Sequence, residues 1–398
     1  MPPASFYMVK KMKKQIPIIL LALFVIFISG CKGIKQQHIN AKIDPEIFGY
    51  QNSYNDFFFE TGDGCYYLNT FNNKIYFSER GQHTFYLLCA KPDCSHTGTD
   101  CNAYGGYALG YFDGHIYTVC LLEKNNDADS DFYLIEMNPD GTEHKEIARL
   151  PSITTQTGAS AAGMSEYYFH KGYLYMTLGP FTNLEPDASV RFYRIDLKTG
   201  DIERLFEDAI PEHAQSLNRT SFFDDTVYLI LRDYTSGKCG VWEASVTDGT
   251  LRKLTIPWTV GSTRVTKFGD TLYYYLNGTG YCEYNLTADE QRVPLPADYA
   301  YTETVYTEDF IFSQTADDAD GGGTAFQVFS RDYRELAAMP LTRVGLNTPL
   351  FCYTGTDTLW FSLNDGKLFA YLDLSEIGSD DIKLTVMDDP YDSRKILS

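Results

Sequence analysis

Short hydrophobic runs bounded by turn residues fill most of the chain. The runs are rich in Val, Ile, Tyr and Phe and alternate with Gly, Asp, Asn and Pro, a pattern typical of β-strands joined by tight turns. One stretch predicts strands at Tyr107 to Phe112, His115 to Glu123, Asp131 to Asn138 and Thr142 to Leu150. The next predicts strands at Met164 to His170, Tyr173 to Gly179, Val190 to Lys198 and Asp201 to Glu207. No window has a convincing helical period, so we predict an all-β fold.

A turn residue followed by a β-rich group and an aromatic side chain recurs seven times. The aromatic anchors are Tyr67, Tyr117, Tyr175, Tyr228, Tyr273, Phe312 and Trp360, spaced 39 to 58 residues apart. Their mean spacing of about 49 residues matches the period of a four-stranded propeller blade. We expect these anchors to be packing residues within the blades.

Seven four-stranded units in series predict a seven-bladed β-propeller. Radial repetition of antiparallel sheets leaves only short strand edges exposed, which suits a chain of this length. Six or eight blades, or two stacked sandwiches, are the alternatives that the pattern leaves open.

The N-terminus has the features of an export signal. Lys10, Lys11, Lys13 and Lys14 precede an apolar run from Ile16 to Ile28, and Ser29-Gly30-Cys31 follows it. This run is too short for a spanning helix of about 20 residues. The order of charge, apolar run and small residues before a cysteine resembles the bacterial lipoprotein signal, which implies that Cys31 is diacylated and becomes the mature N-terminus. An uncleaved anchor is the alternative, and both place the rest of the chain outside the cytoplasm.

These features divide the chain into four parts. Residues 1–30 are predicted to be the signal peptide, 31–54 the lipidated cysteine and a polar tether, 55–390 the propeller and 391–398 a C-terminal tail. The formal net charge of the whole chain is −20, and removal of four lysines with the signal makes it −24. Because phosphate binding needs basic patches, this charge argues against nucleic acid as a partner. A neutral or cationic ligand is favoured.

Several short motifs resemble known propeller repeats. Met137-Asn138-Pro139-Asp140-Gly141-Thr142 resembles the hairpins of TolB-like propellers, and Asp196-Leu197-Lys198-Thr199-Gly200 resembles a turn of quinoprotein-type repeats. Together with the lipoprotein signal and the cysteine segment below, the chain looks like the uncharacterised β-propeller lipoproteins of Gram-positive anaerobes. This resemblance implies the fold and an extracytoplasmic, lipid-anchored location at the cell membrane, but no activity.

Three cysteines and a histidine cluster between the first and second predicted blades. Cys89, Cys94, His96 and Cys101 are spaced closely enough for three thiolates and an imidazole to close a tetrahedral Zn²⁺ site. A disulfide between two of the cysteines, ordinary in an exported protein, and free thiols are the alternatives. The role is structural in each case, because four such ligands would leave no open metal position for catalysis.

The other cysteines are scattered, and the acidic loops are ambiguous. Cys239 and Cys282, and Cys65 and Cys352, fall in neighbouring predicted blades, but sequence does not give disulfide connectivity. Alternate acids at Asp127, Asp129 and Asp131, and again at Asp317, Asp318 and Asp320, can suggest calcium. The first loop lacks the EF-hand glycine and the bidentate glutamate, so we interpret both groups as solvated turn acids.

No compact catalytic signature occurs in the chain. His115 and His170 lie beside hairpin turns and are interpreted as surface or hairpin residues. We therefore predict a binding or scaffolding module for an envelope protein or extracellular ligand, held on the membrane by its lipid anchor. A carbohydrate-active or peptidase-like propeller enzyme with carboxylates or His in the central channel is the alternative.

Overall fold

The structure is a computed structural model. It describes residues 57–70, 72–82, 84–123, 130–152, 166–179, 189–217, 220–258, 264–296, 301–315, 325–340, 351–354, 358–362, 368–377 and 384–386. The chain divides into two units, Met1–Ile39 and Asn40–Ser398, and every described residue belongs to the second. The predicted signal peptide, Cys31, the tether and the C-terminal tail lie outside the described residues.

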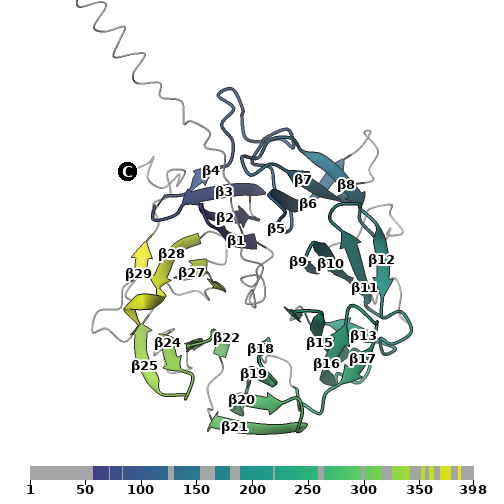
Figure 1. The fold of residues 1–398 in the computed structure, drawn as a ribbon, viewed down its shortest axis with the longest axis vertical. Coiled ribbons are helices and arrows are strands. Elements are labelled where there is room, and N and C mark those ends of the chain that lie inside the picture. The colour runs from purple at the N-terminus through teal and green to yellow at the C-terminus, as the bar shows by residue number, and fades with distance from the viewer. Residues whose placement is uncertain are drawn as a thin grey trace, which may run out of the picture. The chain divides into compact units, whose positions relative to one another are not determined.

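The described strands pair into seven antiparallel sheets, and the fold is an all-β propeller (Figure 1). Sheet 1 holds β1 (Phe58–Thr61), β2 (Gly64–Asn69), β3 (Lys74–Glu79) and β4 (Tyr86–Leu87). Sheet 2 holds β5 (Leu109–Phe112), β6 (His115–Glu123), β7 (Ser130–Met137) and β8 (Lys145–Arg149). Sheet 3 holds β9 (Glu166–His170), β10 (Tyr173–Leu178), β11 (Arg191–Asp196) and β12 (Ile202–Leu205). The strand predictions for sheets 2 and 3 are confirmed to within a few residues at each end.

The remaining sheets repeat the same order. Sheet 4 holds β13 (Ala214–Ser216), β14 (Ser221–Phe223), β15 (Thr226–Asp233), β16 (Cys239–Ser245) and β17 (Leu251–Lys253). Sheet 5 holds β18 (Thr266–Phe268), β19 (Thr271–Leu276), β20 (Gly280–Asn285) and β21 (Glu290–Pro296). Sheet 6 holds β22 (Tyr301–Tyr306), β23 (Phe310–Thr315), β24 (Ala325–Ser330) and β25 (Glu335–Pro340). Sheet 7 holds β26 (Phe351–Thr354), β27 (Thr358–Ser362), β28 (Leu368–Asp373) and β29 (Leu384–Val386), and a 3₁₀ turn η4 (Leu374–Glu376) follows β28.

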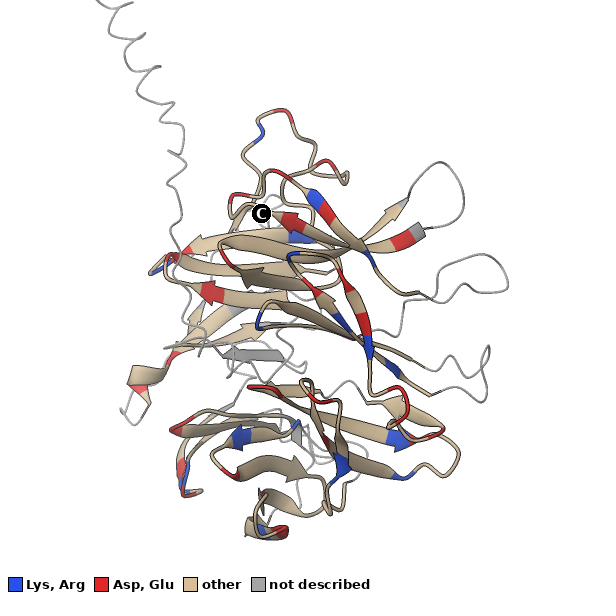
Figure 2. Ribbon diagram, turned by 45° about the vertical axis from the view of Figure 1, so that its right-hand side comes forward, with Lys and Arg blue, Asp and Glu red and all other residues tan. Residues whose placement is uncertain are grey.

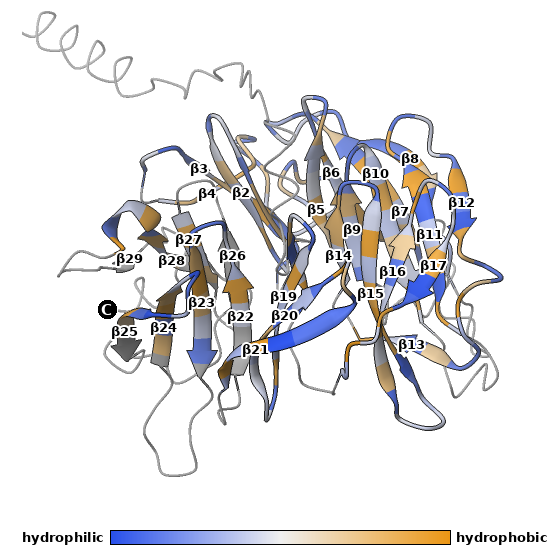
Figure 3. Ribbon diagram, turned by 60° about the horizontal axis from the view of Figure 1, so that its bottom comes forward, coloured by the Kyte–Doolittle hydropathy of each residue, from blue (hydrophilic) through white to orange (hydrophobic). Residues whose placement is uncertain are grey.

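Both faces of the sheets are buried, because each sheet packs against the sheet before it and the sheet after it. Apolar clusters fill these interfaces, and one of them joins sheet 7 to sheet 1. In order along the chain, ring contacts across the interfaces are Phe59–Tyr111, Tyr117–Phe169, Tyr175–Phe222, Trp258–Tyr274, Tyr281–Phe329, Phe326–Phe361 and Trp360–Phe58. The sheets therefore close into a ring. Hydrophobic positions follow the strands, whereas the outer strand β21 is hydrophilic (Figure 3).

The repeated aromatic anchors lie on the second strand of each sheet and mostly pack between sheets, as predicted. Tyr117, Tyr175, Tyr228, Phe312 and Trp360 are at most 5% exposed and face the following sheet. Tyr273 is only partly buried and lies under the Arg331 guanidinium, 4.0 Å from the ring centroid.

The first copy of the repeat is displaced by one residue. Tyr66, not Tyr67, faces the following sheet, whereas Tyr67 faces sheet 7. Because side chains alternate between the two faces of a strand, Tyr66 is the structural counterpart of the other anchors.

Candidate metal centre and seam pocket

The edge of β3 brings the two ends of the cysteine segment together. Leu88, directly before Cys89, donates its N–H to the carbonyl of Ile75. The N–H of Ile75 in turn bonds the carbonyl of Ala103, two residues after Cys101, and Tyr104 forms a bridge with Lys74. The chain therefore leaves β3 after Leu88 and returns to the same edge at Ala103, so Cys89 and Cys101 meet although eleven residues separate them.

The structure brings together all four residues that the spacing predicted. The thiol sulfurs of Cys89, Cys94 and Cys101 and a ring nitrogen of His96 lie within 4.8 Å of one another. The Cys101 Sγ and His96 Nδ1 atoms are 3.6 Å apart. Cys101 is fully buried, whereas the other three are partly exposed. This arrangement has the composition and the compactness of a four-ligand metal site.

Backbone amides are directed at the three sulfurs. Each sulfur accepts an N–H from the residue two positions later, namely Lys91, His96 and Ala103. Burial raises the pKa of Cys101 to about 11, although the Ala103 amide opposes the rise. At Cys89 burial also acts to raise the pKa, but hydrogen bonds from the backbone of Lys91 and Asn102 and from the neighbouring thiols bring it below its usual value. Such amides favour the thiolate form that a metal needs.

A buried ammonium group lies beside this cluster. Lys74 is 6% exposed, and its Nζ atom has no hydrogen-bond partner. The group lies 5.1 Å from the ring centroid of Tyr104 and acts electrostatically on the Cys101 thiol. An uncompensated buried charge is costly, so Lys74 needs negative charge nearby. The sequence spacing gives no sign of this residue, because its place depends on the pairing of β3.

The cysteines that the structure describes are all free thiols: Cys65, Cys89, Cys94, Cys101, Cys120, Cys239 and Cys282. Cys239 and Cys282 lie on β16 and β20 in neighbouring sheets, as the repeat predicted, but they are not bonded to each other. The side chains of Cys31 and Cys352 lie outside the described residues. Cys89, Cys94 and Cys101 are thus not bonded to one another here, and thiol counting on the purified protein tests the disulfide alternative.

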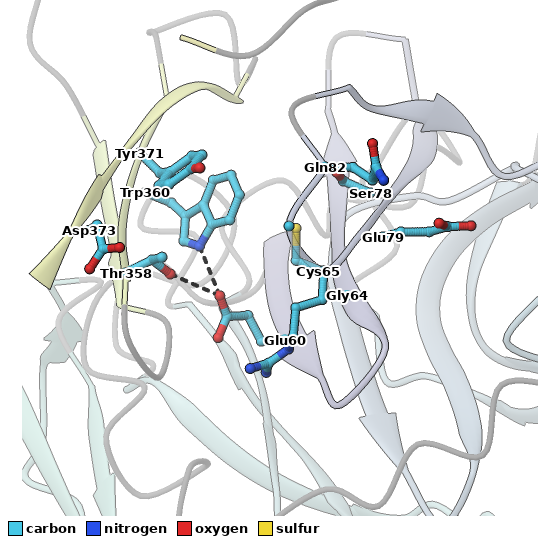
Figure 4. Close-up of a pocket in the computed structure, with 12 residues that line it drawn as sticks. Glu60, Gly64, Cys65, Ser78, Glu79, Gln82, Thr358, Trp360, Tyr371 and Asp373 are labelled. Atoms are coloured by element: carbon cyan, nitrogen blue, oxygen red, sulfur yellow. Dashed lines mark hydrogen bonds between the residues drawn. The ribbon is translucent and has the colours of Figure 1, made fainter. Parts of the chain in front are cut away.

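A second candidate site is a pocket at the seam between sheets 1 and 7, with a cavity volume of about 230 Å³. Glu60, Cys65 and Ser78 are directly paired across β1, β2 and β3, so they share the face turned toward sheet 7. On the other side, Thr358 and Trp360 of β27 pair with Asp373 and Tyr371 of β28. Figure 4 shows Thr358 and Trp360 directed toward Glu60 across the pocket.

Polar groups converge in this pocket. The Glu60 Oε1 atom accepts hydrogen bonds from the Thr358 hydroxyl and the Trp360 indole, each at 3.0 Å. Ser78 is 1% exposed, and its hydroxyl has no hydrogen-bond partner. Burial, and then the charge of Glu60, raise the pKa of Cys65 well above its usual value, so this thiol stays neutral. The pocket combines a fixed carboxylate, an unpaired hydroxyl and two aromatic rings.

Glu166 on β9 is a buried carboxylate that the sequence did not single out. It accepts hydrogen bonds from the hydroxyls of Ser216 at 2.6 Å, Thr220 at 3.2 Å and Tyr168. These donors hold sheets 3 and 4 together next to Arg264, which donates to the Thr220 carbonyl. A carboxylate so fully hydrogen-bonded is suited to a structural role.

Two further sequence interpretations have outcomes in the structure. His170 lies at the hairpin between β9 and β10, as expected, and it is buried there, at 4% exposed. Its Nε2–H donates to the Asp224 carbonyl of the next sheet, which explains the burial. Among the acidic loop residues only Asp131 is described, and it pairs with Arg149 at 2.8 Å. Asp127, Asp129, Asp317, Asp318 and Asp320 lie outside the described residues.

Comparisons with known proteins identify no sequence family. No family model matches the chain, and no curated protein matches it. The resemblance to uncharacterised propeller lipoproteins therefore stays a prediction.

Among solved structures, BamB from Moraxella catarrhalis is 12% identical over 79% of this chain and 92% of that chain, with a TM-score of 0.40. PorZ, an essential bacterial surface component of the type-IX secretion system of Porphyromonas gingivalis, is 10% identical over 86% of this chain and 39% of its own, with a TM-score of 0.46. The designed protein Ika4 is 10% identical over 42% of this chain and 89% of its own, with a TM-score of 0.29. Identities this low say nothing about a shared activity.

The helices of the described part of the chain include none that is long and apolar enough to cross a membrane. Acidic and basic residues are interspersed over the described sheets (Figure 2).

Proposed function

We propose that the protein is a seven-bladed β-propeller, held outside the cytoplasmic membrane by a lipid on Cys31, that binds a ligand or an envelope protein without catalysing a reaction. In this proposal, each of the seven sheets is one blade of the propeller. The tether 31–54 would separate the ring from the membrane surface.

The seam pocket is the observation that carries the binding role. It lies where the first and last sheets meet, and residues about 300 positions apart in the sequence contribute to it. Concave sites that combine apolar walls with a few fixed polar groups are the usual ligand sites of proteins. Here Trp360 and Tyr371 supply the apolar wall, while Glu60 and Ser78 supply fixed polar atoms.

The charge of the pocket favours a small organic cation. Three carboxylates line it, those of Glu60, Glu79 and Asp373, against the single guanidinium of Arg80. An ammonium group would gain both the carboxylates and the electron-rich faces of aromatic rings. The negative charge of the chain outside the signal peptide acts in the same direction.

Binding is favoured over catalysis by how the carboxylates are held. Oε1 of Glu60 accepts hydrogen bonds from Thr358 and Trp360, and the buried Glu166 accepts three hydroxyls. Hydrogen bonds from the protein's own side chains occupy these oxygens and fix the carboxylates in place, which suits a structural or binding role. The propeller enzyme remains the alternative function, and turnover of an oligosaccharide or peptide by the purified protein would establish it.

The anchor is tested by Cys31→Ser in the expressing cell. The wild-type protein should fractionate with membranes and take up labelled fatty acid, and the variant should do neither. Cys239→Ser is the matched control, because it removes a partly exposed thiol from β16, outside the predicted signal sequence. Unchanged membrane retention of Cys31→Ser would refute the lipid anchor.

The pocket is tested by titration of the propeller with tetramethylammonium, glucose and acetate while the thermal midpoint and the tryptophan fluorescence are followed. We expect tetramethylammonium to stabilise the protein and acetate to have no effect. Glu60→Gln keeps an acceptor for Trp360 but removes the charge, so it should abolish the response to the cation. A response to acetate, or an equal response of the wild type and Glu60→Gln to tetramethylammonium, would contradict the proposed ligand class.

A further inference from the structure

We propose that Cys89, Cys94, His96 and Cys101 bind a single Zn²⁺ ion in a closed tetrahedral site, with the Lys74 ammonium as the counter-charge of the site. The ion would fix the connection between sheets 1 and 2. This inference is independent of the ligand proposed for the seam pocket.

The donor set selects the type of metal. Three sulfur donors and one imidazole suit zinc, whereas calcium and magnesium take oxygen ligands. Zinc bonds of about 2.3 Å to sulfur and about 2.0 Å to nitrogen place neighbouring donor atoms of a tetrahedron roughly 3.5 to 3.8 Å apart. The four donor atoms here lie within 4.8 Å of one another, and one pair is already at 3.6 Å. Small side-chain shifts therefore suffice to close the shell around one ion.

The surroundings of the sulfurs are those of a metal site. Metal-bound thiolates are commonly supported by outer hydrogen bonds, and these supports affect metal affinity by about 10- to 100-fold. Here every sulfur of the cluster accepts a backbone N–H from the residue two positions later. The amides are already directed at the sulfurs, so the ligands need little rearrangement on binding.

The charge of the site accounts for Lys74. Three thiolates and a neutral imidazole around Zn²⁺ carry a net charge of −1, and one ammonium group balances it. Lys74 is buried, its ammonium group lacks a hydrogen-bond partner, and it lies over the ring of Tyr104, three residues after Cys101, which makes it the cation that the geometry provides. A disulfide between two of the cysteines would leave this buried cation with less negative charge to offset it.

The segment needs the metal because it has little core of its own. Ala90, Lys91, Pro92 and Asp93 are exposed, so packing contributes little to their order. The ion would tie this excursion to Cys101, which is fully buried between sheets 1 and 2. Four protein ligands saturate the metal, so the site is structural and has no position for a substrate.

The first experiment measures metal in protein purified under reducing conditions without chelator. We expect about one equivalent of zinc, and an absorption spectrum typical of tetrahedral cobalt–thiolate coordination after replacement of zinc by Co²⁺. Cys94→Ser should lose at least nine tenths of the zinc. The control Cys120→Ser removes a thiol from β6 of sheet 2 that is not one of the four proposed ligands, so it should keep the zinc. Less than a tenth of an equivalent of zinc in the wild type, iron in its place, or a disulfide found by thiol counting and mass spectrometry would overturn the proposal.

The second experiment tests Lys74 by competition with a chromophoric chelator. Lys74→Met should weaken zinc binding about tenfold, since the site would keep its ligands but lose its counter-charge. Lys74→Arg should restore most of the affinity, and the exposed Lys253→Met should leave it unchanged. Equal zinc affinity of the wild type and Lys74→Met would refute the role of Lys74.

Discussion

At the residue scale, buried polar side chains of this propeller connect neighbouring sheets. Glu166 accepts from Ser216, Thr220 and Tyr168, and its two oxygens join sheet 3 to sheet 4. Glu60, which is partly buried, does the same between sheets 1 and 7 by accepting from the buried indole of Trp360 and from Thr358. Because a buried donor that loses its acceptor pays for desolvation, each carboxylate should matter more to stability than a surface charge.

Replacement of Glu166 tests this at a single position. We expect Glu166→Ala to lower the free energy of unfolding by about 2 to 4 kcal/mol, because the buried hydroxyls of Thr220 and Tyr168 and the partly buried hydroxyl of Ser216 lose their carboxylate acceptor. Glu207→Ala removes an exposed carboxylate that pairs with Arg204 and should cost less than about 0.5 kcal/mol. Urea denaturation of both variants measures the difference, and equal costs would contradict the role given to Glu166.

His170 gives the fold a dependence on pH. Burial lowers the pKa of His170, and the positive charge of Lys171 lowers it further. The hydrogen bond to the Asp224 backbone and the negative charges of Asp224 and Asp225 oppose this shift without cancelling it. The folded state therefore binds this proton less readily than the unfolded chain, whose histidine titrates near 6.5. The stabilising contribution is present above about pH 6.5 and is lost as the pH falls through the lowered pKa of the folded state.

The expected slope is at most about 1.4 kcal/mol per pH unit for this one group. His170→Gln keeps an N–H donor for the Asp224 carbonyl but does not titrate, so it should flatten the loss of stability between pH 7 and pH 5. His115→Gln is the control at a more exposed hairpin. Denaturation curves across this pH range that are equally steep for His170→Gln and the wild type would exclude His170 as the source.

At the element scale, the sequence predicts strands well and the register less well. The strand His115–Glu123 is found with the same bounds, because Asp113-Gly114 before it is a strong turn signal and both residues have positive φ. In sheet 1 the anchor is Tyr66 instead of Tyr67, since two adjacent tyrosines fit the pattern equally and only packing distinguishes them. A one-residue error exchanges the two faces of a strand.

The residues of the candidate sites also differ in how well the sequence predicts them. The four clustered ligands are recognisable from their spacing, because they lie within thirteen consecutive residues. Lys74 and Glu60 are not, because their neighbours depend on strand pairing and on closure of the ring. Sequence reasoning therefore finds local ligand sets and misses the groups that long-range contacts add.

Gly141 and Gly249 lie in similar hairpins with similar backbone conformations but differ in what surrounds them, so substitutions at the two positions distinguish the cost of backbone strain from the cost of packing. Gly141 and Gly249 both follow an aspartate in a tight turn, with φ of 77° and 72°. A Cβ at Gly141 would lie 2.5 Å from the Asn102 carbonyl and 2.8 Å from that of Leu88, whereas nothing lies within 4 Å at Gly249. The Gly141 hairpin therefore packs closely on the two ends of the cysteine segment.

We expect Gly249→Ala to cost about 1 kcal/mol of unfolding free energy, the usual penalty of a left-handed conformation for a residue with a side chain. Gly141→Ala should cost at least about 1 kcal/mol more, because the backbone that it contacts cannot move freely. Gly141→Ala should also reduce the metal content, and Gly249→Ala should not. Equal stability and equal metal content of the two variants would mean that the contact between this hairpin and the cysteine segment is unimportant.

At the scale of the whole molecule, closure of the ring depends on contacts between sheets 1 and 7. Phe58 and Phe85 pack against Trp360, and the Trp360 indole donates to Glu60. Bringing together residues this far apart in sequence costs loop-closure entropy before any contact forms, so we expect the seam to form late in folding. The same contacts line the seam pocket, so ligand binding in the pocket should be lost when sheets 1 and 7 separate.

A pair of tryptophan substitutions measures the seam directly. Trp360 and Trp258 are similarly buried, at 5% and 6% exposed, but only the indole of Trp360 has a hydrogen-bond partner. Replacement of either by Phe removes a similar volume, so the loss of packing should largely cancel in the comparison. Trp360→Phe also removes a donor from the Glu60 carboxylate, which should cost about 1.5 to 3 kcal/mol more than Trp258→Phe. Urea midpoints of the two variants provide the measurement, and hydrogen exchange at β1 and β27 should rise only in Trp360→Phe. If Trp258→Phe is at least as destabilised, the Glu60 contact does not hold the ring closed.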